Sequence, residues 1–270
     1  RRQRQMCIRD RGFTLVAAGI KPQNYTVSDT ASYLPKGVEW VADKVTEIDP
    51  EGRKVVTAGG KTLRYDFLIV ALGLELHYAG IEGMDTARIG QDGLGSIYHS
   101  PSAASATWGA MSQFANAGGV GVFGRPAGEM KCAGAPLKYT FITDDRLRRA
   151  GQRSRAELIY MAQSKSLFGV PIVAEKVRML FQDRGVKVHH EHVLQSIDLG
   201  KRVATYRTPT GTSEQAYDFI NVVPPMRAPD PVRNSPLPWT EGPFAADGWM
   251  EVDRDTLRHK RYPNVFGLSL

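Results

Sequence analysis

Two stretches of the chain share one pattern, "YDFLIVALG" at residues 65–73 and "YDFINVVPP" at residues 217–225. Each begins with Tyr-Asp-Phe and continues as an apolar run. In the first stretch the run 67–72 is continuously apolar, which is typical of a strand buried on both faces, and Gly73 ends it. The repeat predicts equivalent strands in two related domains.

The residues around these stretches alternate between strand and helix patterns. Strands are expected at 119–124, 156–162 and 186–190, with helices at 102–117, within 135–150 and at 172–185. Further strands are expected at 38–50, on both sides of a turn at 58–60, and at 193–199 and 202–208. Strands separated by helices of this length indicate right-handed βαβ units on a parallel sheet. The predicted fold class is α/β, with two Rossmann-like domains in tandem.

Composition limits the class of protein. The chain has 270 residues, 42% hydrophobic and 23% charged, which fits a globular protein of one large or two modest domains. No apolar run approaches the roughly 18 to 20 residues that span a bilayer, although peripheral attachment to a membrane stays open. The two cysteines, Cys7 and Cys132, argue against a disulfide-stapled secreted domain and for a reducing compartment.

The net charge of +7 is concentrated at one end. The first eleven residues, "RRQRQMCIRDR", carry +4 of it, so the remaining +3 gives no reason to expect a nucleic-acid partner. The segment shows neither helical nor strand periodicity, and we interpret residues 1–11 as a non-native, adapter-derived segment that carries Cys7 with it. The alternative is a genuine basic arm.

Residues 119–124, "GVGVFG", match the pattern G-x-G-x-x-G, but we do not interpret them as a dinucleotide fingerprint. That fingerprint needs a strand before the first glycine and a helix that starts at the third. Here the glycines lie on the expected strand, and Arg125-Pro126 follows. A nicotinamide site is therefore not expected.

The cluster "HHEH" at 189–192 is the one histidine-rich stretch. On a strand only His190 and His192 share a face, and no cysteine or fourth ligand accompanies them. We expect a solvated strand edge and no metal site.

Cys132 lies in "EMKCAGAPLK", residues 129–138, at or just before the expected helix. The unpaired N–H groups of a helix N-terminus and the neighbouring Lys131 both favour the thiolate. Small residues after Cys132 leave room for a flat group to approach. A reactive thiol is the favoured interpretation, and a buried, inert cysteine is the alternative.

Six segments in order carry a resemblance to a known family. They are "FTLVAAGIK", "LPKGVEWVADKVTEIDP", "YDFLIVALGLEL", "KCAGAPLK", "VVPPMRAPDPVRNSPL" and "GWMEVDRDTLRHKRYPNVFG", spread between residues 12 and 267. On these segments the chain resembles the sulfide:quinone oxidoreductases, specifically the branch that includes the mitochondrial enzyme. Six ordered segments are far more specific than any single motif.

The resemblance implies a flavoprotein of the glutathione-reductase type, with FAD and NAD(P)-type Rossmann domains and two redox cysteines beside the flavin. Cys132 matches the first of these cysteines. Sulfide would attack the cysteine pair to form a persulfide, and two electrons would pass through FAD to a membrane quinone, with the sulfur going to an acceptor. The parent protein would be peripheral to a membrane, the bacterial or the mitochondrial inner membrane.

The resemblance also assigns residues to the cofactor. Val45 matches the position whose backbone meets the adenine of FAD, and Ala71, Leu72 and Gly73 match a turn close to the cofactor, where a glycine permits close approach. Pro224 and Pro225 end the second domain's last strand, and Asp230 follows in a loop near the flavin. For these last three the alternatives are plain strand termination and a solvated turn.

The chain departs from the family at both ends. The family's G-x-G-x-x-G should precede residue 12, and Phe266-Gly267-Leu268 should lead into Gly-Asp and the second redox cysteine. The resemblance therefore implies a fold truncated at both ends, with the membrane contact and the quinone site in a missing C-terminal region. Expected domains are the FAD-binding domain at 12–104 and 226–270, and the second Rossmann-like domain at 105–225.

Two alternative functions stay open. One is a non-catalytic protein of the same fold. The other is an NAD(P)H-dependent flavin disulfide reductase, which the unsuitable glycine pattern at 119–124 disfavours.

Overall fold

The computed structural model describes residues 6–8 and 12–268 of the 270-residue chain. The chain divides into two compact units. Unit 1 comprises Arg1–Tyr33 and His77–Pro225, and unit 2 comprises Leu34–Leu76 and Met226–Leu270. These compact units differ in their limits from the domains expected at 12–104, 105–225 and 226–270, which stay a prediction about the longer protein.

Unit 1 is built on a five-stranded parallel sheet in the order β11-β10-β9-β15-β8. The strands are β8 (Leu94–Gly95), β9 (Gly119–Gly124), β10 (Ala156–Ala162), β11 (Val186–His190) and β15 (Phe219–Asn221). Its helices are α2 (Pro101–Ala117), α3 (Ala135–Arg149) and α4 (Pro171–Asp183). The expected alternation of strands and helices is confirmed here almost residue by residue.

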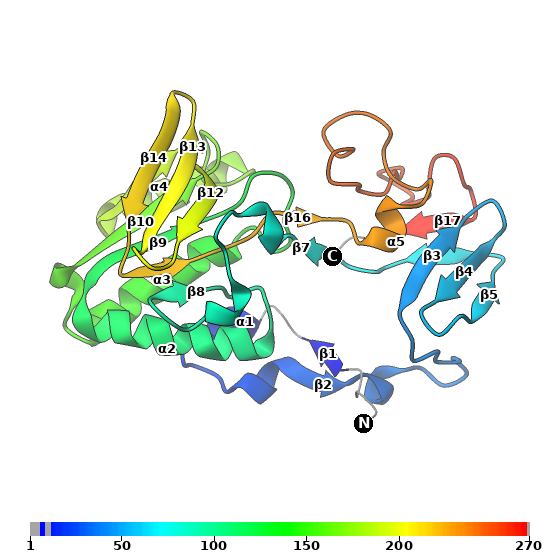
Figure 1. Ribbon diagram of the computed structural model, residues 1–270, viewed down its shortest axis with the longest axis horizontal. Coiled ribbons are helices and arrows are strands. Elements are labelled where there is room, and N and C mark those ends of the chain that lie inside the picture. Colours follow the sequence, from blue (N-terminus) through cyan, green and yellow to red (C-terminus); the bar gives the residue numbers. More distant parts are fainter. Residues whose placement is uncertain (1–5, 9–11, 269–270) are drawn as a thin grey trace. The chain divides into compact units, whose positions relative to one another are not determined.

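Two layers cover this sheet. Figure 1 shows α2 and α3 on one side of it and an antiparallel meander on the other. The meander consists of β12 (Val193–Asp198), β13 (Val203–Thr208) and β14 (Gly211–Ala216). Apolar residues of the sheet, such as Val122 and Ile220, join Ala204 and Tyr206 of the meander in one buried cluster. The meander therefore closes the core over the carboxyl half of the central strands.

The beginning of the chain contributes short elements to unit 1. They are β1 (Met6–Ile8), α1 (Phe13–Val16) and β2 (Val27–Asp29). β1 pairs with β2 in antiparallel register, so the expectation of no strand within residues 1–11 is wrong for these three residues. Residues 1–5 and 9–11 lie outside the described part, and the interpretation of 1–11 as non-native stays a prediction.

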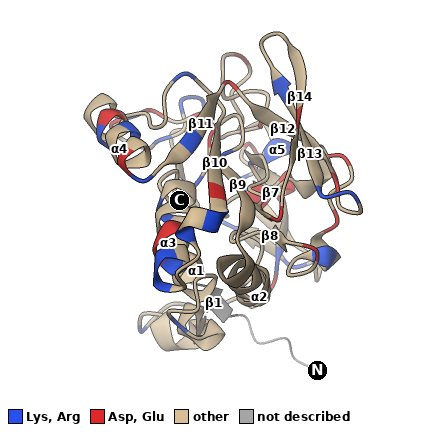
Figure 2. Cartoon of the chain, turned by 90° about the vertical axis from the view of Figure 1, so that its left-hand side faces the viewer, with Lys and Arg blue, Asp and Glu red and all other residues tan. Residues whose placement is uncertain are grey.

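A buried carboxylate joins three parts of unit 1. The Asp144 side chain in α3 is fully buried and accepts hydrogen bonds from Arg148 Nε at 2.9 Å, Arg153 Nε at 2.6 Å and Arg184 Nη1 at 2.9 Å. Burial alone would raise the pKa of Asp144, but the three guanidinium groups outweigh it and hold the pKa below its ordinary value. Figure 2 shows both signs of charge interspersed on α3 and α4.

Unit 2 consists of small sheets around one core. An antiparallel meander of β3 (Val45–Asp49), β4 (Lys54–Thr57) and β5 (Thr62–Arg64) contains the hairpin expected around 58–60. Two further pairs are β6 (Leu68–Val70) with β17 (Val265–Gly267), and β7 (Glu75–Leu76) with β16 (Met226–Arg227). The one-turn helix α5 (Asp230–Arg233) packs on β3.

The strand β6 differs from the expectation of burial on both faces. Val70 is 7% exposed, but Phe67 is 73% exposed and Ile69 is 63% exposed. The reason is that β6 has one strand partner, β17, in the described part of the chain. Its second edge and one face are therefore uncovered, and the expectation is wrong for these side chains.

His259 is a buried histidine in unit 2, 1% exposed. Its Nε2 donates to the Leu237 carbonyl at 2.9 Å, and its Nδ1 accepts from the backbone N–H groups of Arg261 and Tyr262 at 3.1 and 3.2 Å. Nδ1 can accept only when it carries no proton, so the ring is neutral. Burial is the main cause that lowers the pKa of His259.

The histidine cluster lies at the sheet edge formed by β11. The rings of His189 and His192 are 5.3 Å apart, so the expected pairing of His190 with His192 on one face is wrong. The strand ends at His190, and Glu191 has a φ of 59°, which turns His192 toward the other face. Among the described residues no group of three or more potential metal ligands occurs. None of the described helices has the length and apolar character to cross a membrane.

Candidate functional site

The turn that carries Cys132 links β9 to α3. Cys132 lies two residues before Gly134, the N-cap of α3, and its carbonyl accepts a hydrogen bond from the Ala135 N–H at 2.8 Å. Its thiol is free and exposed. The described geometry therefore disfavours the buried, inert alternative, and whether the thiol is reactive stays a prediction.

The backbone of this turn is strained, and a side-chain hydrogen bond holds it in place. Cys132 has a φ of 54°, in the left-handed region that non-glycine residues rarely occupy. The nearly buried Tyr98 hydroxyl donates to the Cys132 carbonyl at 3.0 Å. This contact fixes the peptide that follows the thiol, and nothing in the sequence around Tyr98 indicated it.

The helix α3 that follows is anchored firmly in unit 1. The Tyr139 hydroxyl, fully buried, donates to the Ala17 carbonyl at 2.8 Å, and the Tyr139 ring packs edge-on against Phe123 at 6.1 Å. Burial raises the pKa of Tyr139 well above its ordinary value, so its hydroxyl keeps its proton. The N-terminus of α3 is thus a fixed platform for the Cys132 turn.

A groove of about 600 Å³ runs between α3 and α4 and reaches Gly134, two residues from Cys132. Its walls are mainly apolar side chains, including Leu137, Phe141 and Val177, with Lys138 and Arg184 as cationic groups. This volume is in the range of small-molecule pockets.

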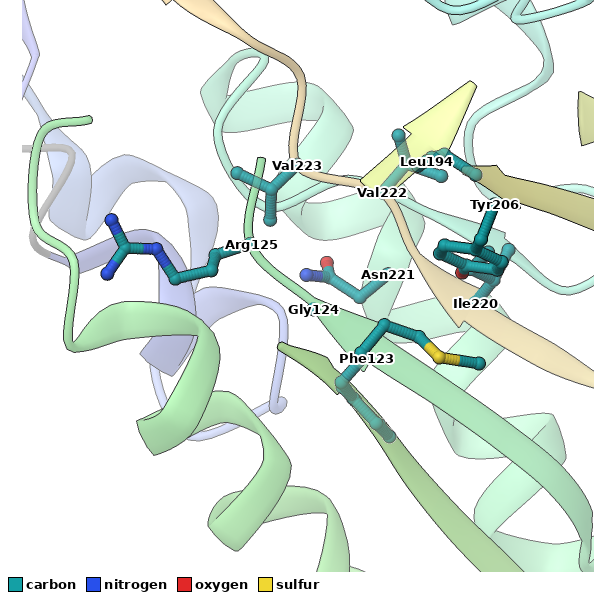
Figure 3. Close-up of a pocket in the computed structure, with 10 residues that line it drawn as sticks. Phe123, Gly124, Arg125, Leu194, Tyr206, Ile220, Asn221, Val222 and Val223 are labelled. Atoms are coloured by element: carbon teal, nitrogen blue, oxygen red, sulfur yellow. The ribbon is translucent and has the colours of Figure 1, made fainter. Parts of the chain in front are cut away.

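A second, much smaller cavity lies at the carboxyl edge of the sheet. It has room for about 20 Å³. It is lined by Phe123, Gly124, Arg125, Met161, Leu194, Tyr206, Ile220, Asn221, Val222 and Val223 (Figure 3). The glycines of 119–124 lie inside β9 rather than at a helix start. These glycines therefore do not have the strand-loop-helix placement of a dinucleotide fingerprint.

Asn221 is the unusual member of this lining. It is 3% exposed, and among the described residues neither its Oδ1 nor its Nδ2 has a hydrogen-bond partner. A polar residue inside the apolar run 217–225 was the available signal, and the sequence interpretation passed over it.

The residues expected at the cofactor fall into both units. Pro224 is buried and Pro225 half-buried in unit 1, directly after β15, and the Pro225 carbonyl accepts from the His77 N–H at 2.8 Å. Val45, Ala71, Leu72, Gly73 and Asp230 belong to unit 2.

Within unit 2 these residues surround one core. Val45 begins β3 and packs on the cluster that contains Val70, which precedes Ala71, and Val232 of α5. Asp230, the first residue of α5, is exposed and pairs with Arg233 at 3.2 Å. Their roles at a cofactor stay a prediction.

The turn after β6 presents exposed backbone that a ligand can approach. Ala71 and Leu72 are exposed, and Gly73 has a φ of 71° with open space where a β-carbon would stand. A left-handed glycine followed by free space permits a flat ligand to approach the backbone. These residues fit the cofactor role that the sequence suggests.

Comparisons with known proteins agree with the sequence resemblance. The chain is 35% identical over 260 residues to the mitochondrial sulfide:quinone oxidoreductase of Mus musculus, covering 95% of this chain and 56% of that protein. The corresponding protein of Dictyostelium discoideum is also 35% identical, with 95% and 55% covered. The chain is a relative of the sulfide:quinone oxidoreductases. No protein-family profile matches it.

Solved structures show the same fold. The sulfide:quinone oxidoreductase of Aquifex aeolicus superposes with a TM-score of 0.81 at 22% identity, covering 97% of this chain and 59% of that one. An NAD-dependent persulfide reductase from A. fulgidus gives 0.60 at 18% identity, with 96% and 46% covered. The predicted α/β fold of tandem Rossmann-like type is confirmed. The chain spans between about half and three fifths of the length of these relatives.

Proposed function

We propose that this chain is part of a sulfide:quinone oxidoreductase in which Cys132 is a redox cysteine. The similarity to the mouse protein over 95% of the chain carries the proposal. The exposed, strained Cys132 turn on a fixed helix N-terminus supports it. The enzyme would oxidise sulfide, reduce a membrane quinone and be peripheral to a bacterial or mitochondrial inner membrane.

The cofactor of this reaction is FAD. Val45 and the Ala71–Gly73 turn would hold it in unit 2, with Asp230, Pro224 and Pro225 near it. When bound, FAD supplies a two-electron acceptor that can pass electrons on to a quinone.

The chemistry of Cys132 is thiol exchange. In the oxidised protein Cys132 forms a disulfide with a second cysteine outside the described residues. Hydrosulfide attacks this disulfide, one S–S bond forms and one breaks, and a persulfide and a cysteine thiolate result. The persulfide sulfur then goes to an acceptor thiol, and its cysteine is left as a thiolate. The two cysteine thiolates re-form their disulfide, a two-electron oxidation for which bound FAD would supply the acceptor.

Residues of this chain position Cys132 for this chemistry. Cys132 lies two residues before the N-cap of α3, with Lys131 as its neighbour in the sequence. Tyr98 fixes the peptide beside it. The groove that reaches Gly134 has room for a small-molecule sulfur acceptor.

The proposal is tested with Cys132→Ser in the full protein that contains this chain, loaded with FAD. A hydroxyl cannot form a persulfide, so sulfide-dependent reduction of a soluble ubiquinone analogue should fall by roughly 1,000-fold or more, while flavin absorbance is retained. Thr212→Ser, at an exposed position of β14, is the control and should leave the rate unchanged. Full activity in Cys132→Ser, or no sulfide-dependent activity in the unsubstituted protein, refutes the proposal.

A nicotinamide-dependent disulfide reductase is less well supported. Some structural neighbours are named as NAD-dependent, such as the persulfide reductase from A. fulgidus. In this chain, however, the cavity at the carboxyl edge of the unit 1 sheet has room for about 20 Å³. Bleaching of the bound flavin by NADH would revive that alternative.

A further inference from the structure

The small cavity between the unit 1 sheet and its meander contains an amide that lacks partners among the described residues. Asn221 ends β15, is 3% exposed, and has both side-chain polar atoms unpaired. Figure 3 shows its side chain among the residues that line the cavity. Leaving such a group unpaired in the interior is unfavourable, so a buried amide without a partner among the described residues indicates a bound molecule.

The size of the cavity limits that molecule. A cavity needs roughly 10–15 Å³ to hold one water molecule. The room here is about 20 Å³, which is enough for one molecule of that size or slightly larger. An organic ligand or a polyatomic anion is too large to lie wholly inside this volume.

The chemistry of the lining defines the class of ligand. The Asn221 amide offers a donor and an acceptor, so a ligand that both donates and accepts can serve either atom. Most other lining side chains are apolar, among them Phe123, Leu194 and Ile220, and Met161 contributes a polarizable thioether. The lining also includes Arg125, but its guanidinium points away from Asn221 (Figure 3), so a neutral molecule suits the walls around the amide better than an ion.

We propose that this cavity binds one small neutral molecule, either water or hydrogen sulfide, through the Asn221 amide. The two molecules share shape and hydrogen-bonding pattern, and the hydrogen sulfide source rests on the function proposed above. Gly124 and Arg125 line the cavity and begin the loop that reaches Cys132 seven residues later. The bound molecule therefore lies at the base of the segment that presents the thiol.

The first test is crystallographic and uses the 270-residue chain. Crystals are measured before and after an anaerobic soak in sodium sulfide below neutral pH, at a wavelength where sulfur scatters anomalously. One density peak within hydrogen-bond distance of Asn221 supports the proposal. A peak without anomalous signal in both data sets identifies water, and an anomalous peak after the soak identifies hydrogen sulfide. The sulfur of Met161, in the same cavity, calibrates the signal.

An empty cavity in both data sets overturns the proposal. This outcome is independent of the proposed function, because the test needs no turnover, no cofactor and no quinone. Conversely, if the proposed sulfide:quinone function proves wrong, the proposal that the cavity binds water still stands.

The second test is a substitution that removes the amide and fills the space, Asn221→Leu. If the amide holds a ligand, the variant loses the density peak and its melting temperature stays equal or falls. If the cavity is empty, the substitution removes an unpaired polar group, and the melting temperature rises by several degrees. Asn116→Leu, the same change at an exposed position of α2, is the control. Should Asn221→Leu fail to fold, the crystallographic test still decides.

Discussion

The two stretches that begin Tyr-Asp-Phe share this start and an apolar character but differ in their surroundings. In unit 1, Phe219 is fully buried, stacks on Phe114 at 5.7 Å, and belongs to a strand with β9 on one side and β8 on the other. In unit 2, Phe67 is 73% exposed, just before a strand that pairs with β17. An apolar run can form a strand in both places, but the neighbouring strands and layers decide which faces are buried.

The difference in burial is small at the tyrosine and large at the phenylalanine. The hydroxyls of Tyr65 and Tyr217 are both buried without a hydrogen-bond partner in the described residues. Burial raises the pKa of Tyr65, and it raises the pKa of Tyr217 to about 12. Both hydroxyls are thus removed from water, although Tyr65 as a whole is half-buried and Tyr217 is 3% exposed.

The largest expected effect comes from shortening the two phenylalanines. Phe219→Ala should lower the free energy of unfolding by an amount near the upper end of about 3–5 kcal/mol, because it empties a site in a rigid core. Phe67→Ala should change it by less than about 0.5 kcal/mol, since the ring is already largely in water. Urea unfolding of both variants measures the difference. Equal losses would show that Phe67 is covered in solution.

The next largest effect concerns the buried ion-pair network around Asp144 in unit 1. Asp144→Asn should cost about 3 kcal/mol, at the low end for breaking a buried ion pair. The reason is that the Arg148 and Arg184 side chains are 50% and 39% exposed and can regain water. The helical circular dichroism signal reports this loss, because α2, α3 and α4 all belong to unit 1. Asp145→Asn, at the exposed neighbour that pairs with Arg149, should have little effect.

The lowered pKa of Asp144 also sets the pH dependence of unit 1. The carboxylate contributes stability that is present above the ordinary aspartate pKa and is lost as the pH falls through the folded-state value. The Asp144→Asn variant should therefore show a flatter stability profile in acid than the unsubstituted chain. Identical profiles would contradict the role given to this network.

The smallest effect is a pH dependence confined to unit 2. The pKa of His259 is lowered by burial, so the unfolded chain takes up a proton at this histidine near pH 6.5 while the folded chain does not. Unit 2 keeps full stability above that pH and loses it as the pH falls toward the folded-state value, by at most about 1.4 kcal/mol per pH unit. His259→Gln should flatten this slope.

Tryptophan fluorescence can follow unit 2, because Trp40, Trp239 and Trp249 lie in it and Trp108 lies in unit 1. His190→Gln, at an exposed position on the edge strand, is the control and should leave the slope unchanged. An unchanged slope in His259→Gln would show that another group causes any acid sensitivity of unit 2.

The sequence predicted unit 1 well because its elements follow strong local rules. The helix α3 and the strands β9 and β10 agree with the expected ranges, since apolar periodicity and glycine boundaries both mark them. The place of Cys132 just before a helix followed from the same pattern.

What the sequence could not predict depends on contacts between distant residues. The exposure of Ile69 reflects a missing strand neighbour, and the contact of His189 with His192 reflects the backbone turn at Glu191. The unpaired amide of Asn221 becomes visible only once β12 and β13 close over β15 and leave a small space. No local pattern contains that information.

The left-handed backbone at Cys132 bears on how this position evolves. Glycine would adopt a φ of 54° without strain, so a residue with a β-carbon is disfavoured there on conformational grounds alone. The exposed thiol also gains nothing from burial in a core. Cysteine at this position therefore costs backbone stability that glycine would not, a cost that the redox role proposed for its thiol would explain.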